Sequence, residues 1–274
     1  MSRLLSISIC LALVSSTSAV ADDGAAEPFQ NVVPASELVN LKMLTMDGVD
    51  IGTVSDIVID REYGQIAFFA VRSKRSTNVL GNAYFLPASS VSLSSNAGRL
   101  TCNSTFEDVE HYGDLTKSGP MPLINTAVMS KLYSHYEAKP YWDTSVKVDQ
   151  QLSLITVDEL DGRIVRDSDW HVIARVKELL VEATGNWRVA YLSLGALPDA
   201  KTNQRIAVPM AAFAQETLSP TWLLDVPESA LLLKQTFKRG DWPTEVNPGW
   251  NEFVHVKYGT STAAGLQDAG TKTN

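Results

Sequence analysis

The sequence predicts a mainly β protein with two small β-barrels, a connecting helix and an aromatic C-terminal extension. Three observations lead to this fold class. Two stretches of the chain are similar in register, each contains apolar, β-branched runs that end at a turn, and a helix-spaced apolar pattern separates them. The composition, with 45% apolar and 20% charged residues, is that of a chain able to form a core.

The internal repeat pairs residues 47–73 with residues 168–195. Val54 aligns with Val176, which lies 122 positions later. A duplication kept in register over this length rarely arises by chance, so we predict that the two copies superpose on these positions. Further pairs at the same offset are Asp56 with Glu178, Asp60 with Glu182, Pro87 with Pro209 and Val91 with Phe213.

Each copy contains a predicted β-hairpin. In the first copy the run 51–59 is followed by a turn at 60–64 and a return strand at 66–71. Gly64, matched with Gly185 in the second copy, supplies the positive φ that the turn needs. Apolar residues occur on both faces of these strands, so both faces must be covered, as in a small closed barrel or in a sheet packed against a neighbour. We therefore expect ten side chains to be buried: Ile57, Ile59, Phe68, Val71, Val91, Leu179, Val181, Val189, Leu192 and Phe213.

The chain between and after the copies is expected to be partly helical and partly extended. Residues 121–138 have apolar side chains close to helical spacing, and Pro140 ends the pattern. The last residues are rich in small and polar types, which favours disorder. The predicted divisions are a signal peptide at 1–21, a flexible leader at 22–36, barrel units at 37–110 and 151–235, a helical connector at 111–150, the aromatic extension at 236–259 and a disordered tail at 260–274.

The first 21 residues have the pattern of a secretory signal. Arg3 precedes a short apolar run at 4–14, and Ala19-Val20-Ala21 provides small residues at the cleavage site. The run is shorter than the roughly 20 apolar residues that a membrane-spanning helix needs. The sequence thus predicts export to the periplasm or beyond the cell, with no membrane span after cleavage. The alternative interpretation is an uncleaved membrane anchor.

Charge and cysteine content exclude some classes of function. The formal net charge of −8 argues against nucleic acid and anionic membranes, which select basic surfaces. Cys10 lies in the predicted signal peptide, so the mature chain keeps only Cys102 and has no internal disulfide. We interpret Cys102 as a small buried hydrophobe, the alternative being a reactive thiol.

Several of these residues resemble the PRC-barrel family. The run IGTVSDIVID, a glycine turn, a second apolar strand and a Leu-Pro ending carry the resemblance, over residues 38–110 and again over 155–235. The family includes the cytoplasmic part of the reaction centre H subunit and a ribosome maturation factor. The second copy departs from the pattern at Ala174 and Trp170, where the first has Gly52 and Gly48. Residues 237–259 are also similar to the aromatic tail of exported bacterial PRC-barrel proteins. The resemblance implies a barrel fold used for binding and assembly, with no catalytic residues to transfer.

No catalytic constellation is visible in the sequence. None of the mature histidines has a metal-ligand partner at a spacing such as HxxxH, and there is no GxSxG, glycine-rich phosphate loop or CxxC. We therefore expect no enzyme activity and no cofactor. Asp56 and Asp60 share strand parity and are candidate ligands of a weakly bound cation. Alternatively Asp60 organises the hairpin turn and Asp56 is a solvated rim residue.

The aromatic residues supply the candidates for partner binding, which are Trp170, Trp242, Trp250 and Tyr258. The alternative for such side chains is packing in the core or at a barrel seam. The sequence thus favours an exported, non-catalytic interaction or assembly module that binds a protein partner in the cell envelope. The second hypothesis is a small-ligand or cation-binding protein that uses acidic clusters at the barrel edges. Whether copies of the chain form a homo-oligomer is left open.

Overall fold

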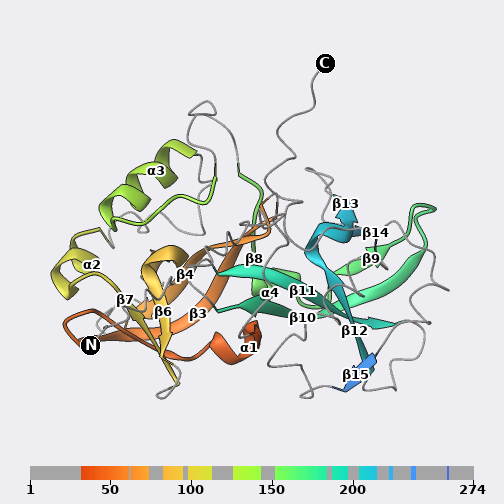
Figure 1. The fold of residues 1–274 in the computed structure, drawn as a ribbon, viewed down its shortest axis with the longest axis horizontal. Coiled ribbons are helices and arrows are strands. Elements are labelled where there is room, and N and C mark those ends of the chain that lie inside the picture. Colours follow the sequence, from red (N-terminus) through yellow and green to blue (C-terminus); the bar gives the residue numbers. More distant parts are fainter. Residues whose placement is uncertain are drawn as a thin grey trace, which may run out of the picture.

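The fold is known from a computed structural model of the chain. It describes residues 32–61, 63–73, 83–94, 98–112, 126–142, 152–183, 187–196, 204–214, 222–224, 236–238 and 258. Fifteen strands in these ranges join into one twisted sheet (Figure 1). The mainly β class is confirmed. The described strands do not close into barrels, because the strand order runs from β13 (Phe213–Ala214) to β6 (Val91–Ser94) without returning on itself.

The first unit of the sheet is built around one long hairpin. Strands β3 and β4 pair antiparallel, and β5 pairs with the other edge of β4. On the far side of β3, β2 pairs with both β3 and β7, and β7 forms a hairpin with β6. A short helix, α2, ends the unit. The elements are β2 (Lys42–Leu44), β3 (Asp50–Asp60), β4 (Gln65–Ser73), β5 (Ala83–Pro87), η1 (Ala88–Ser90), β6 (Val91–Ser94), β7 (Arg99–Cys102) and α2 (Phe106–Tyr112).

The second unit repeats this order of strands. Its elements are β9 (Ile164–Arg166), β10 (Val172–Glu182), β11 (Arg188–Ala196), β12 (Gln204–Pro209), η3 (Met210–Ala212), β13 (Phe213–Ala214) and β14 (Trp222–Leu224). Val54 pairs with Val71 and Val176 with Leu194, and the register shifts of the two hairpins fall at matching positions. The structure therefore confirms the sequence alignment before the turn.

The alignment across the turn needs a correction. The N–H of Val189 donates to the carbonyl of Gly64 at 2.8 Å, and the N–H of Ile66 donates to the carbonyl of Trp187 at 2.9 Å. This reciprocal pair makes Trp187, and not Gly185, the counterpart of Gly64. Both have a positive φ, of 44° and 60° respectively. Glycine adopts this conformation freely, whereas tryptophan does so at a cost.

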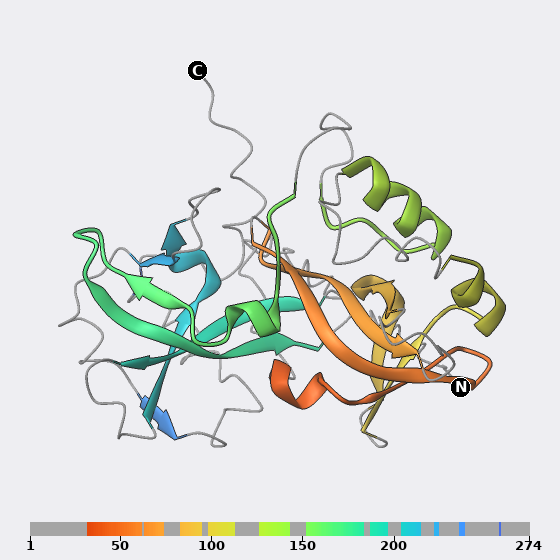
Figure 2. The same ribbon diagram turned by 180° about the vertical axis from the view of Figure 1, so that it is seen from behind.

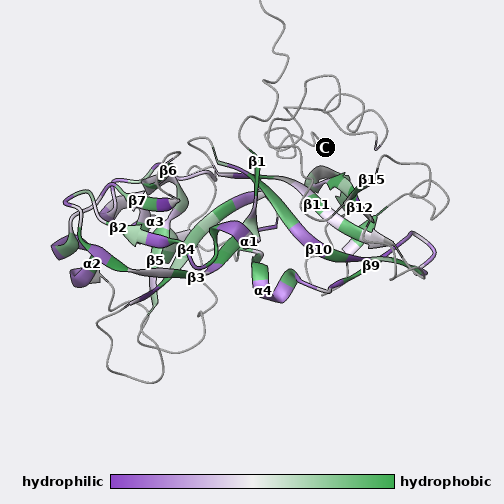
Figure 3. Ribbon diagram, turned by 90° about the horizontal axis from the view of Figure 1, so that it is seen from below, coloured by the Kyte–Doolittle hydropathy of each residue, from purple (hydrophilic) through white to green (hydrophobic). Residues whose placement is uncertain are grey.

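The N-terminal segment of each unit packs on the other unit. β1 (Val32–Pro34) pairs with β10 and is followed by α1 (Ala35–Leu38), while β8 (Leu154–Thr156) pairs with β3 and is followed by α4 (Val157–Leu160). Val33 lies opposite Val181, and Ile155 lies opposite Ile59. Because these partners are related by the repeat offset, the two units exchange strands about a local twofold axis. Figures 1 and 3 show α1 and α4 close together in the middle of the molecule.

This exchange also corrects the predicted leader. Residues 32–36, which the sequence assigned to a flexible segment, form β1 and the start of α1. Their order comes from backbone pairing with β10, a partner far away in the sequence. Such a partner leaves no local pattern that a short segment could reveal.

Different elements cover the outer faces of the two units. On the first unit lies α3 (Thr126–His135), within the predicted helix 121–138, of which residues 121–125 lie outside the described ranges. The hydroxyl of Tyr133 donates to the carbonyl of Ala67 at 2.8 Å. On the second unit, β15 (Thr236–Lys238) pairs with β12, and Phe237 and Tyr258 pack on a buried cluster. That cluster consists of Val32, Leu180, Tyr191 and Ala207. Figure 2 shows α2 and α3 on the outer side of the first unit.

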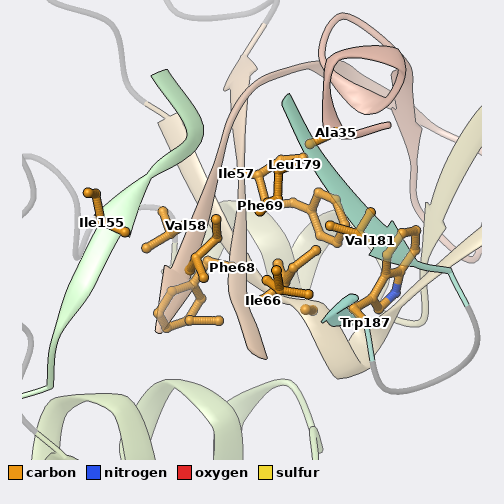
Figure 4. Packing of buried hydrophobic residues seen from close by; sticks show 14 of the residues in the cluster. Ala35, Ile57, Val58, Ile66, Phe68, Phe69, Ile155, Leu179, Val181 and Trp187 are labelled. Atoms are coloured by element: carbon orange, nitrogen blue, oxygen red, sulfur yellow. The ribbon is translucent and has the colours of Figure 1, made fainter. Parts of the chain in front are cut away.

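The core runs through both units. All ten side chains that the sequence predicted to be buried are buried. Figure 4 shows Ile57, Phe69 and Ile66 of the first unit packed with Leu179, Val181 and Trp187 of the second. Each buried side chain of this size contributes about 1.5–3 kcal/mol. The two units therefore share one hydrophobic core.

Some predictions concern residues that the structure does not describe. The signal peptide at 1–21, most of the leader, Trp242, Trp250 and the tail at 260–274 lie outside the described ranges. Within those ranges, no helix combines the length and the apolar character needed to cross a membrane.

Candidate functional site

A groove of about 390 Å³ lies on the local twofold axis, between α1 and α4. It is bounded on both sides by equivalent parts of the two units. Its apolar lining is Val39, Val157, Leu160, Val176 and Leu179, and its polar lining is Ser36, Asn40, Ser55, Asp56, Asp158, Asp161, Lys177 and Glu178. The groove is therefore an apolar concavity with a largely acidic rim.

Two equivalent carboxylates hold the exchanged helices in place. Asp56 accepts hydrogen bonds from the N–H of Ile57 at 2.8 Å and from the N–H of Asp158, in α4, at 3.4 Å. Glu178 accepts one from the N–H of Leu179 at 2.9 Å, and its two oxygens accept from the N–H and hydroxyl of Ser36, in α1. A carboxylate at a helix N-terminus satisfies N–H groups that have no partner within the helix.

The Asp56 carboxyl of this groove is partly buried, and burial changes its pKa. Burial raises the pKa of Asp56 above its ordinary value of 3.8, and the N–H groups of Ile57 and Asp158 partly offset this rise. A carboxyl whose pKa is raised by folding stabilises the protein while protonated and loses this contribution as pH rises through the folded pKa. Ionisation of Asp56 at neutral pH therefore lowers the free energy of unfolding.

We expect Asp56→Asn to raise the free energy of unfolding at neutral pH. The amide oxygen keeps an acceptor for the two N–H groups while the charge is removed. Urea melts over a pH series should show the advantage shrinking as pH falls toward 3.8, because the folded wild-type carboxyl takes up its proton above that pH. Asp47→Asn, on an exposed turn, controls for the loss of one charge from an acidic chain. An advantage for Asp56→Asn that does not depend on pH would contradict this account.

Asp60, the other predicted cation ligand, lies in a different environment. It is fully buried and accepts a hydrogen bond from the Tyr141 hydroxyl at 3.0 Å. Its counterpart Glu182 is also buried and pairs with Arg188 at 2.6 Å. Within the described ranges, no three or more His, Cys, Asp or Glu side chains are grouped to hold a metal ion. The structure therefore gives Asp56 and Asp60 separate partners.

Trp170 sits at the tip of the turn between β9 and β10 and is 52% exposed. The Asp167 carboxylate fixes this turn by accepting hydrogen bonds from the N–H groups of Asp169 at 3.0 Å and His171 at 2.8 Å. Trp170 has φ +65°, and its counterpart in the first unit is Gly48, with φ +80°. The second unit thus places an exposed indole where the backbone favours glycine.

The remaining sequence candidates are placed less favourably for binding. Tyr258 is half-buried and packs on the second unit, and burial raises its pKa. Cys102 is buried, its pKa is raised by burial, and its counterpart in the second unit is Leu224. This agrees with its interpretation as a small buried hydrophobe.

Sequence reasoning missed the groove residues on α1 and α4. One signal was available, because Thr156 and Glu159 form the spacing of a helix capping box, which the structure shows to be present. A second was the similarity of Ser36-Glu37-Leu38 to Asp158-Glu159-Leu160 at the repeat offset. Neither signal indicates that the segments cross to the other unit.

One protein-family model matches the first unit of the chain. The family model of the PRC-barrel domain matches residues 30–109. This range begins just before β1 and ends within α2, so it includes the exchanged segment. No curated protein matches the chain.

Proposed function

Since residues 30–109 form a PRC-barrel domain, we propose that the chain is an exported, non-catalytic interaction module that binds a protein partner in the cell envelope. The expected signal peptide supports export. The PRC-barrel domain, together with a sequence that offers no catalytic constellation, supports a binding role. The single observation that carries the proposal is the exposed indole of Trp170.

The conformation of Trp170 is the reason to assign it a function. A non-glycine residue with positive φ costs of order 1–3 kcal/mol and persists at sites where another requirement outweighs the strain. Trp170 gains little from burial in return, because half of its surface is exposed. Tryptophan is also enriched among residues that dominate the energy of protein interfaces. Binding of a partner by this side chain accounts for both features.

We expect Trp170→Gly to abolish partner capture while leaving the free energy of unfolding unchanged or higher. Glycine accepts the positive φ, and the turn keeps its hydrogen bonds from Asp167. The measurement combines a urea melt with affinity capture from the cell envelope, in which a photo-crosslinker stands at the exposed Ser168 in both the wild type and the variant.

The matched control is position 46 on the corresponding turn of the first unit, where Met46 is 63% exposed. A crosslinker placed there tests whether any exposed apolar tip captures the same protein. Equal capture from both turns, or a stoichiometric partner that still binds Trp170→Gly, would refute the role given to Trp170. Repeated failure to recover any stoichiometric partner would count against the function itself.

A further inference from the structure

We propose that the sheet face of the second unit beside the Trp170 turn docks an acidic segment of the protein partner. The inference rests on the proposed function, because it names the chemistry of the partner that contacts Trp170. Four cationic side chains carry it, those of Arg166, Arg175, Lys177 and Arg205, and we call them the basic face.

The basic face lies on the side of the sheet that points away from the shared core. Strands β9, β10, β11 and β12 lie side by side in the second unit (Figure 3). Arg175 lies opposite Ile164 of β9 and opposite Gly195 of β11, and its neighbours on either side in β10 are buried in the core. Arg166 is two positions beyond Ile164, so its side chain is on the same face as that of Arg175.

Gly195 lets two cationic side chains approach one point of this face. A Cβ atom on Gly195 would lie 3.1 Å from Cγ of Lys177 and 3.4 Å from Nη1 of Arg205. Lys177 belongs to β10 and Arg205 to β12, so the two side chains reach the glycine from opposite sides. Like charges brought together in this way repel each other, and a carboxylate of a partner beside both would offset the repulsion.

The structure orients two of the guanidinium groups without neutralising them. Arg175 donates to the carbonyl of Gly162 at 2.9 Å, and Arg166 donates to the carbonyl of Trp170 at 2.6 Å. Over the described ranges, no carboxylate forms an ion pair with Arg166, Arg175 or Lys177. The hydrogen bond of Arg166 also connects the basic face to the Trp170 turn.

This combination of side chains fits a protein segment better than other anions. Tryptophan and arginine are enriched among the residues that dominate the energy of protein interfaces. The net charge of −8 disfavours nucleic acids and anionic membranes, which act on the charge of the whole molecule. A short acidic segment of a protein meets the basic face alone, where the local charge is complementary.

The probe for the basic face is a fluorescein-labelled oligoglutamate peptide, titrated into the full chain and followed by fluorescence anisotropy. We expect saturable binding that weakens as the ionic strength rises, and no binding of an oligoserine peptide of the same length. The absence of saturation, or equal binding of the oligoserine, would overturn the proposal. Tighter binding of oligothymidylate or of phosphatidylglycerol vesicles would also overturn it, in favour of a nucleic acid or a membrane.

Variants locate the site. Lys177→Gln with Arg205→Gln should weaken oligoglutamate binding about threefold to tenfold, because two cations of the basic face are lost. Lys177→Gln alone serves if the double variant does not fold. The matched control is Lys42→Gln with Arg72→Gln, which removes two exposed cations from the first unit. This control should bind the peptide as the wild type does, and equal weakening would contradict the assignment.

Capture of the envelope partner through Ser168 separates this inference from the proposed function. The variant Lys177→Gln with Arg205→Gln should capture the partner more weakly than the wild type. A stoichiometric partner captured equally by both would overturn the acidic docking and leave the role of Trp170 intact. Binding of oligoglutamate without any captured partner would support the basic face and count against the proposed function.

Discussion

Replacement of Trp187 by alanine is expected to lower the free energy of unfolding by about 3–5 kcal/mol, the range typical of a large aromatic side chain removed from a core. Trp187 belongs to the second unit but packs in the first. Its ring is 4.9 Å from that of Phe69, and its indole N–H donates to the carbonyl of Val91 at 2.7 Å. The alanine variant loses this packing and leaves a buried carbonyl without its donor.

Two further variants separate packing from backbone strain. Trp187→Gly should be about 0.5–1 kcal/mol more stable than Trp187→Ala, because the position has φ +44°. Trp170→Ala, at the other positive-φ tryptophan, should change stability less, since that residue is 52% exposed. Chemical melts of the wild type and of these three variants measure the differences in the free energy of unfolding. A loss of less than about 1 kcal/mol for Trp187→Ala would show that the two units do not share a core.

A chain ending at Thr236 is expected to unfold at a clearly lower urea concentration than the full chain. The truncation removes most of β15 and exposes the cluster of Leu180, Tyr191 and Ala207, on which Phe237 and Tyr258 pack. Loss of two partly buried aromatic side chains corresponds to about 2–5 kcal/mol. The slope of the transition should also change if less apolar surface is buried in the native state.

The control for this truncation is a chain ending at Gly259. It keeps Phe237 and Tyr258 and lacks only the segment that the sequence predicts to be disordered. Its midpoint and slope should equal those of the full chain. If the chain ending at Thr236 also has an unchanged midpoint, the extension is a free appendage and becomes the better candidate for partner binding.

The hairpins and their burial could be predicted from the sequence because their signals are local. Alternating and continuous apolar runs identified β3, β4, β10 and β11, and their buried residues followed from the pattern. The strands β1 and β8 could not be found in this way. Each has three residues and is ordered by pairing with the other unit. Two-sided burial fitted either a closed barrel or a sheet packed against a neighbour, and the structure has the second, because the other unit and α3 cover the sheet.

The site was only partly predictable for the same reason. Trp170 was recognised from the sequence as a tryptophan next to the acidic Asp167 and Asp169. The groove needs Asp56 beside Asp158 and Glu178 beside Ser36, pairs that are more than 100 residues apart in the chain. No spacing rule connects such pairs, since their proximity follows from the twofold arrangement of the units.

The exchange of strands between the units is the central claim, and a pair of engineered disulfides tests it most directly. In a chain that starts at residue 22, cysteine at position 33 is combined either with cysteine at 181 or with cysteine at 59. Val33 lies opposite Val181 in the exchanged arrangement, and directly opposed residues of antiparallel strands are close enough for a disulfide. Without the exchange, β1 would pair with β3 of its own unit in the place that β8 occupies. Val33 would then lie opposite Ile59, as Ile155 does in the structure. Peptide mapping of the oxidised monomer should show a 33–181 disulfide and none between 33 and 59, whereas a 33–59 disulfide would contradict the exchange.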